Sequence, residues 1–76
     1  MENRYEIIKR LKSEGLFTEL VHSGIIGFNI VTRVTIYEEY LKQLDTNKKS
    51  IAIQRVATSM KVSESNLYLI IRYLEQ

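Results

Sequence analysis

Apolar residues recur every three or four positions along most of the chain, which is the spacing of amphipathic helices. Near the N-terminus, Tyr5, Ile8 and Leu11 form such a stripe, and it predicts a helix over residues 2–13. Gly15 is expected to end this helix, because glycine adopts the left-handed backbone conformation without a steric cost.

The next apolar cluster predicts a short second helix. Its members are spaced at i, i+1, i+4 and i+5: Leu16, Phe17, Leu20 and Val21. Gly24 and Gly27 then interrupt the pattern on either side of two isoleucines, which is typical of a break between helices.

Residues 28–44 carry the longest regular pattern in the chain. Apolar side chains recur there at alternating intervals of four and three residues, as in a coiled-coil seam: Ile30, Val34, Tyr37, Leu41 and Leu44. A helix over this range would be about 25 Å long, since each residue adds about 1.5 Å. Residues 30–37 are also rich in alternating β-branched side chains, so a strand is the alternative there.

The last third of the chain contains two further helical stripes, separated by a break near Lys61. The first predicts a helix over residues 50–59, capped by Ser50. Its inner face is formed by Ile53, Val56, Ala57 and Met60. The second helix is expected after Ser63, whose hydroxyl can accept a hydrogen bond from a backbone N–H of the first turn. Its inner face is formed by Leu67, Ile70, Ile71 and Leu74.

These two helices and their turn resemble the helix-turn-helix superfamily of DNA-binding proteins. The resemblance lies within residues 50–72 and is carried by seven positions: Val56, Ala57, Met60, Lys61, Val62, Leu67 and Ile70. Ala57 matches the position where the helices cross closely, and Val62 the position that enters the core from the turn. Lys61 departs from the pattern, because the family usually has glycine there. A left-handed lysine would cost about 1 to 2 kcal/mol.

A weaker resemblance extends over the segments IYEEYLKQL, TNKKS and VSESNLYLIIRYLE. These segments are similar to small phage and mobile-element regulators, including the Mor-type activators of Mu-like phages. The apolar spacing alone arises in any helical hairpin, so two core helices without a role in DNA binding are the alternative.

The helix-turn-helix resemblance implies that the outer face of the last helix contacts DNA bases in the major groove. Five residues are expected on that face: Ser65, Asn66, Tyr68, Leu69 and Arg72. Asparagine can pair with adenine and arginine with guanine through two hydrogen bonds, and leucine can contact a thymine methyl group. Four flanking cations are expected to contact phosphates: Lys48, Lys49, Arg55 and Lys61.

The charge distribution is consistent with a polyanionic partner near the C-terminus. Residues 1–45 hold six Lys and Arg against seven Asp and Glu, whereas residues 46–76 hold five against two. The net charge of +2 therefore conceals a positive excess in the C-terminal part of the chain.

Further apolar residues of the 28–44 helix lie off its seam, so this helix needs cover on more than one face: Phe28, Val31, Ile36 and Tyr40. A second copy is the expected cover, because an exposed apolar patch is a liability in a small monomer. The interface of this homodimer is predicted along the seam: Ile30, Val34, Tyr37 and Leu41. The alternative is that the first two helices cover both faces within one chain.

Several other classes of function are not expected. The chain has no cysteine and one histidine, His22, so neither a disulfide framework nor a metal site is expected. The neighbouring Glu38 and Glu39 point away from each other on a helix, and the glycine spacing fits no nucleotide-binding fingerprint. We therefore expect no enzymatic activity, no cofactor and no small-molecule substrate. Because neither a membrane span nor a secretory signal is visible, a cytoplasmic location without a membrane partner is expected.

The sequence thus predicts a single all-α domain over residues 1–76, with four or five helices and a C-terminal helix-turn-helix. Residues 1–45 are expected to pack and dimerise, and residues 46–76 to form the helix-turn-helix region. The predicted function is sequence-specific binding of double-stranded DNA by a homodimeric transcription regulator of a phage or mobile element. The alternative is a non-catalytic helical module that binds a protein partner, such as a phage or mobile-element adaptor.

Overall fold

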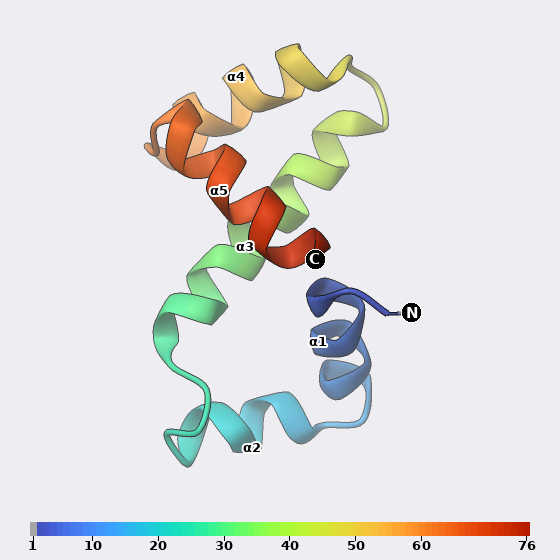
Figure 1. Cartoon of the computed structure of the whole chain (residues 1–76), viewed down its shortest axis with the longest axis vertical. Coiled ribbons are helices and arrows are strands. Elements are labelled where there is room, and N and C mark those ends of the chain that lie inside the picture. Colours follow the sequence, from blue (N-terminus) through green and yellow to red (C-terminus); the bar gives the residue numbers. More distant parts are fainter. Residues whose placement is uncertain (1) are drawn as a thin grey trace.

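The computed structural model describes residues 2–76, except for the side chain of Phe28. Within this range the chain forms five helices and no strand (Figure 1). They are α1 (Arg4–Ser13), α2 (Leu16–His22), α3 (Phe28–Leu44), α4 (Lys49–Met60) and α5 (Glu64–Glu75). The predicted all-α class is confirmed. The strand alternative for residues 30–37 is wrong, because these residues lie inside α3.

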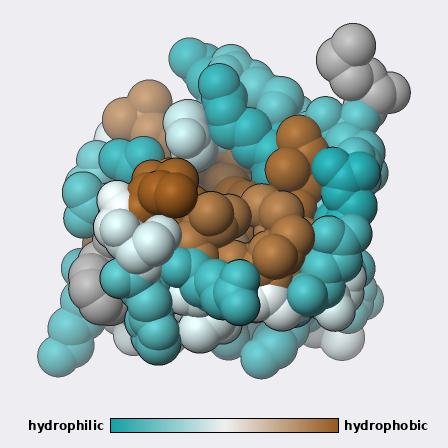
Figure 2. Space-filling model, turned by 90° about the horizontal axis from the view of Figure 1, so that it is seen from below, coloured by the Kyte–Doolittle hydropathy of each residue, from teal (hydrophilic) through white to brown (hydrophobic). Residues whose placement is uncertain are grey.

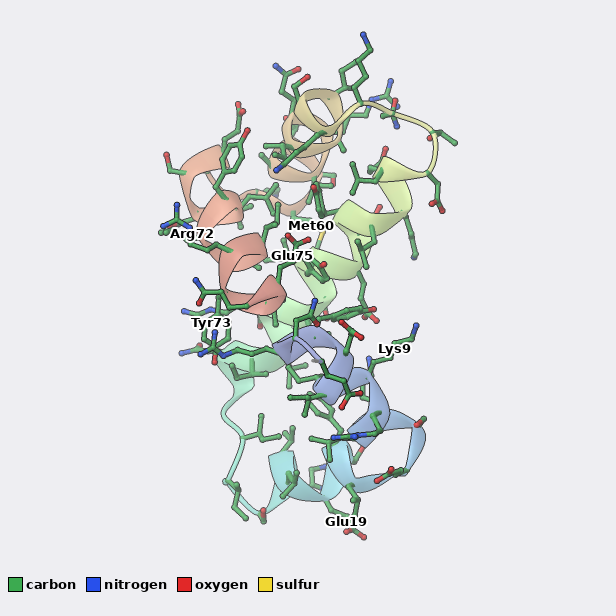
Figure 3. The ribbon with its side chains drawn as sticks, turned by 45° about the vertical axis from the view of Figure 1, so that its right-hand side comes forward. Lys9, Glu19, Met60, Arg72, Tyr73 and Glu75 are labelled. Atoms are coloured by element: carbon green, nitrogen blue, oxygen red, sulfur yellow. The ribbon has the colours of Figure 1, made fainter. Side chains whose placement is uncertain are left out.

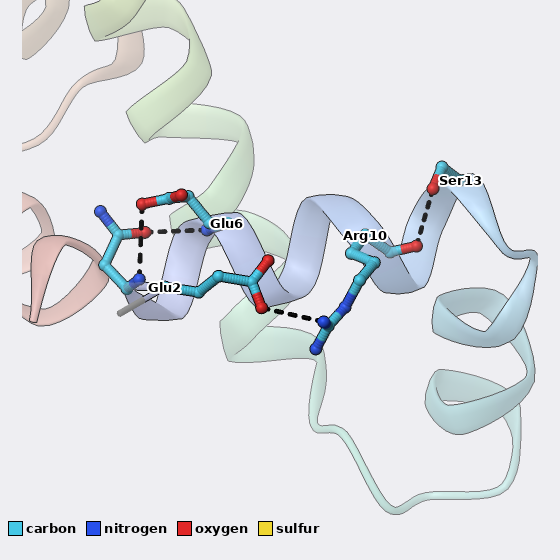
Figure 4. A network of polar contacts seen from close by, with 5 residues as sticks. Glu2, Glu6, Arg10 and Ser13 are labelled. Carbon is cyan, nitrogen blue, oxygen red and sulfur yellow. Dashed lines mark hydrogen bonds and ion pairs between the residues drawn. The ribbon is translucent and has the colours of Figure 1, made fainter.

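A capping box fixes the start of α1 (Figure 4). The Asn3 side chain accepts a hydrogen bond from the Glu6 backbone N–H at 2.8 Å, and the Glu6 carboxylate accepts one from the Asn3 backbone N–H at 3.4 Å. An ion pair of 2.9 Å between Arg10 and Glu2 lies along the same helix. Because Asn3 satisfies an otherwise free N–H of the first turn, α1 begins at Arg4 and not at residue 2.

The long helix α3 runs through the middle of the molecule, and α4 and α5 pack against it (Figure 1). Four of its side chains are buried: Val34, Ile36, Tyr37 and Tyr40. A β-branched residue costs a helix at most about 0.7 kcal/mol relative to alanine. Burial of these side chains outweighs that cost, which explains why the segment is a helix despite its β-branched composition.

The burial of α3 corrects the predicted dimer interface. Val34 and Tyr37 are only 2% and 4% exposed, so their side chains are covered by the chain itself and offer no surface to a second copy. Ile30 and Leu41 are half-buried. The cover within one chain comes mainly from α4 and α5, whereas the alternative assigned it to the first two helices; of these, α1 contributes Tyr5, whose ring centroid lies 4.7 Å from that of Tyr37.

The α4–α5 pair holds the most completely buried side chains: Ile53, Val56, Leu67 and Leu74. Ser63 caps α5 as predicted, since its Oγ accepts a hydrogen bond from the Asn66 backbone N–H at 3.1 Å. Ser50 does not cap α4. The N-cap is Lys48, two residues before the predicted one, and it forms no side-chain cap; the helix begins at Lys49, so Ser50 lies in the first turn.

Toward the other end of the molecule, an apolar hollow of about 280 Å³ lies between α1, α3 and the segment before α3, and Tyr73 of α5 also lines it. Figure 2 views this end and shows apolar side chains surrounded by hydrophilic ones. Five isoleucines line the hollow: Ile7, Ile8, Ile25, Ile26 and Ile30. Ile25 is 73% exposed, so this apolar surface is open to solvent.

Candidate nucleic-acid interface

The turn between α4 and α5 determines how the outer face of α5 is presented. Lys61 has φ of +57° and ψ of +44°, and is the one non-glycine residue with a positive φ in the described chain. The backbone N–H groups of Lys61 and Val62 both donate to the Ala57 carbonyl, the latter at 3.0 Å. Such bonds to the last carbonyls of a helix accompany a left-handed terminating residue. The backbone is thus left-handed at the position where the sequence pattern expects glycine.

The residues around this turn are arranged for close packing. Ala57 is buried, and its small side chain leaves room for the chain to reverse direction beside it. Val62 is half-buried and packs against the core, as predicted. Because Ser63 then caps α5 immediately, the first turn of α5 has a defined orientation relative to α4.

The five residues predicted to contact bases are all exposed on α5: Ser65, Asn66, Tyr68, Leu69 and Arg72. Tyr68 and Leu69 are 49% and 59% exposed, which is high for apolar side chains of this size. The opposite face of α5 is buried in the core. The structure therefore separates the predicted contact face from the packing face of this helix.

Two open grooves border the exposed face of α5, and Leu69 and Arg72 line both of them. The larger, of about 510 Å³, lies between α5 and α3, which contributes Arg33. The smaller, of about 320 Å³, lies between α5 and α4, which contributes Lys49, and Glu75 of α5 also lines it. A cation from a neighbouring helix thus stands on each side of the predicted contact face.

The four cations predicted to contact phosphates are all exposed: Lys48, Lys49, Arg55 and Lys61. Lys49 is brought next to the α5 face, whereas the other three line neither of the two grooves. None of the four forms an ion pair within residues 2–76. The ion pairs of the described chain all use carboxylates that precede α4: Glu2, Glu38 and Glu39.

Sequence reasoning missed a cluster around Tyr73. The Cζ atom of Arg4 lies 4.5 Å from the centroid of the Tyr73 ring, and that of Arg33 lies 5.4 Å from it. Both distances are within the range of cation–π attraction. Arg4 belongs to α1 and Arg33 to α3, so no spacing along the chain signals their meeting with a residue of α5.

Tyrosine hydrogen bonds connect α3 to the helices that flank it. The Tyr37 hydroxyl donates to Glu75 Oε2 at 2.8 Å, and the Tyr5 hydroxyl donates to Glu38 Oε2 at 3.1 Å. Burial, together with the neighbouring carboxylate, raises the pKa of both phenols above its ordinary value. The phenols therefore stay protonated at neutral pH and act as donors that hold α5 and α1 against α3.

Other kinds of site are not visible in the described chain. Within residues 2–76, no three metal-ligating side chains come together in a way that could hold an ion. Of the described helices, none is both long and apolar enough to cross a membrane. Comparisons with protein-family models, with curated proteins and with solved structures found no match.

Proposed function

We propose that the chain binds duplex DNA in a sequence-specific manner as a small transcription regulator. In this proposal α4 and α5 form a helix-turn-helix, and α5 is the recognition helix. The observation that carries the proposal is the exposed face of α5, with Asn66, Leu69 and Arg72 between two grooves that each contain a cation. Base-reading side chains at the centre and cations at the edges are the arrangement that a major-groove contact requires.

The geometry of the turn supports this assignment. A helix-turn-helix needs a left-handed residue to reverse the chain, a small residue at the helix crossing and a hydrophobe directed into the core. Lys61, Ala57 and Val62 meet these three requirements through their backbone angle, burial and packing. A lysine at the left-handed position carries a conformational cost, and it also places a cation next to the start of α5, where it is a proposed phosphate contact.

The charge pattern supports a polyanionic partner. The cations of residues 46–76 form no ion pair with the described carboxylates, so DNA phosphates would not have to displace an internal partner. Lys49 and Arg55 are the proposed phosphate contacts on α4, in addition to Lys48 at its N-cap and Lys61 in the turn. These contacts would position the domain without reading sequence.

Selection from a random pool of duplexes with purified protein tests the proposal directly. We expect an enriched motif, and the affinity for it should decrease with salt. About four phosphate contacts give a slope of log affinity against log salt of roughly −3.6. A pool without enrichment, together with salt-independent binding, would contradict the proposal.

We also propose that the DNA-binding form is a homodimer, and that the enriched motif is palindromic. Because Val34 and Tyr37 lie in the core, the proposed dimer surface is the apolar hollow that includes Ile30. Burial of the exposed Ile25 and its neighbours is the gain that would drive this association.

A second candidate function is favoured by one observation. Leu69 and Tyr68 are exposed apolar side chains at the centre of the α5 face, and such residues also form the anchors of protein–protein interfaces. In that case the chain would be a helical adaptor that binds a protein partner. The two functions differ in salt dependence, because an apolar protein contact responds weakly to salt whereas phosphate contacts respond strongly.

A further inference from the structure

Arginines from three different helices converge near the groove between α3 and α5. Arg33 and Arg72 line this groove, and Arg4 lies close to it, since Arg4 and Arg33 both approach the Tyr73 ring. Figure 3 shows Arg72 and Tyr73 projecting on the same side of the molecule. Residues 1–45, although they hold one more acidic than basic residue, thus contribute cations to the α5 face.

Arg4 and Arg33 differ in whether their guanidinium N–H groups form hydrogen bonds within the chain. Arg4 donates from Nη1 to the Tyr73 carbonyl oxygen and to Gln76 Oε1, both at 3.1 Å, so it ties α1 to the end of α5. The guanidinium of Arg33 contacts the Tyr73 ring but forms no ion pair or hydrogen bond with residues 2–76. A guanidinium carries five N–H donors, so Arg33 is held in place by the ring while its donors remain available.

The surroundings of Arg33 favour an anion. Of the described residues that line this groove, none is Asp or Glu, while Arg33 and Arg72 are both cationic. Asn66 and Gln76 add amide groups that can donate hydrogen bonds to an anionic oxygen. A planar guanidinium fits the oxygens of a phosphate group particularly well, because two parallel hydrogen bonds can form.

We propose that the groove between α3 and α5 binds a backbone phosphate of DNA through Arg33, and that Tyr73 positions Arg33 for this contact. The inference rests on the proposed function, because the groove borders Asn66 and Leu69 on the face that would enter the major groove. A DNA strand read by that face would pass along its edge, where phosphates are the groups within reach. Helix α3, whose main role is in the core, would then also contact DNA.

The variant Arg33→Gln tests the contact, with Lys9→Gln as the matched control. Both remove one positive charge from an exposed side chain, and neither side chain has an ion-pair partner within the described chain. Lys9 projects on the other side of the molecule from Arg72 and Tyr73 (Figure 3). We expect Arg33→Gln to weaken binding to the selected and to a scrambled duplex equally, roughly five- to tenfold at 0.1 M salt, and to make the salt slope shallower by about 0.9. Lys9→Gln should bind nearly as the wild type does.

Duplexes that carry one neutral methylphosphonate at successive positions give a second readout. One position should weaken wild-type binding by the same factor as Arg33→Gln does. The same duplex should cause no further loss in the Arg33→Gln variant, because the contact is already absent. This lack of additivity would identify the phosphate that Arg33 contacts.

The positioning role of Tyr73 is tested with a conservative pair of variants. Tyr73→Phe keeps the ring and should retain wild-type affinity and salt slope. Tyr73→Leu removes the ring and should reproduce part of the loss seen in Arg33→Gln. Circular dichroism of each variant checks that the helices are intact. Equal affinity of the Phe and Leu variants would overturn the positioning role.

The outcomes separate this inference from the proposed function. Wild-type affinity and slope in Arg33→Gln, with weakened binding in Arg72→Ala, would overturn the phosphate contact and leave the recognition helix in place. A loss confined to the selected duplex would also overturn it, because it would make Arg33 a base contact. An equal loss of affinity in Lys9→Gln would also overturn it, because the loss in Arg33→Gln would then follow from net charge alone. If the wild type itself shows no salt-dependent binding to any duplex, the proposed function fails first.

Discussion

The first pair of helices, α1 and α2, and the last pair, α4 and α5, are connected alike but packed differently. In each pair the chain changes direction next to a left-handed residue, Gly15 with φ of +77° and Lys61 with φ of +57°. The last pair contributes the side chains with the least exposure in the molecule. In the first pair only Ile8 and Phe17 are buried, and they retain 9% and 7% exposure.

The difference comes from what covers each pair. Helices α4 and α5 pack against each other and against α3, so their inner faces are covered, while Tyr68 and Leu69 lie exposed among the polar residues on the outer face of α5. Helix α1 packs against α2 and α5, but Ile7, Leu16 and Ile25 stay exposed at that end. Similar turns therefore lead to different surfaces, a mixed polar and apolar helix face over a covered core at one end and an uncovered apolar hollow at the other.

Two glutamate substitutions should show this difference most strongly. Val34→Glu places an unpaired charge in the core, where it should cost about 3 to 5 kcal/mol and unfold much of the chain. Ile25→Glu changes a side chain that is 73% exposed, so the fold should survive while the proposed dimer dissociates. Circular dichroism measures the first effect and sedimentation equilibrium the second, with the wild type expected near twice the 8.9 kDa chain mass.

The same measurements test whether the α3 seam lies in the core of one chain or contacts a second chain. A folded, monomeric Val34→Glu variant, compared with a dimeric wild type, would mean that the seam contacts a second chain in solution. A wild type that is monomeric at every concentration, free and bound to DNA, would remove the dimer proposal and leave the hollow without this role.

The next largest effects are expected on the face of α5. Arg72→Ala and Asn66→Ala should each weaken binding to the selected duplex by about 1 to 3 kcal/mol, because each removes a proposed base contact while leaving the core intact. Thr18→Ala on α2 is the control, since this side chain is also exposed but lies in the first pair. Fluorescence anisotropy against selected and scrambled duplexes measures the change. Wild-type affinity of both α5 variants would remove α5 as the recognition helix.

Much of this architecture was predictable, because local spacing determines where helices form. The bounds of α3, the Ser63 cap and the left-handed Gly15 follow from periodicity and from the chemistry of helix ends. The capping box of α1 was missed although its signal is present, as an asparagine followed three residues later by glutamate.

The remaining features depend on contacts between distant parts of the chain. The heptad spacing shows that Val34 and Tyr37 share one face of a helix, but it does not say which chain covers that face. The approach of Arg4 and Arg33 to Tyr73 joins three helices and leaves no trace in local patterns. The proposed base contacts were predictable as an exposed helix face. The position of Arg33 beside that face was not, because it depends on how α3 packs against α5.

Substitutions at the two left-handed positions should change the free energy of unfolding in opposite directions, and by less than Val34→Glu does. Lys61→Gly should stabilise the chain by up to about 1 kcal/mol or be neutral, because relief of backbone strain offsets the greater freedom of the unfolded chain. Gly15→Ala should destabilise it by about 1 to 2 kcal/mol. No atom lies within 4 Å of a Cβ built at Gly15, so this cost arises from the backbone angle alone. Urea denaturation measures both, and a loss above about 1 kcal/mol in Lys61→Gly would contradict strain at that turn.

The smallest effect at neutral pH should come from the tyrosines that attach each pair to α3. Burial, followed by the contact with Glu75, raises the pKa of Tyr37 furthest, and burial followed by the charge of Glu38 raises that of Tyr5. The folded state therefore keeps these protons at a pH where the unfolded state releases them. Their contribution to stability is complete below about pH 10 and is lost as the pH rises further.

Urea midpoints measured from pH 8 to 11 should fall in the wild type, less steeply in Tyr5→Phe and least steeply in Tyr37→Phe. If the decline were equally steep in all three proteins, the phenol contacts of the two pairs would not differ in the way that their burial indicates.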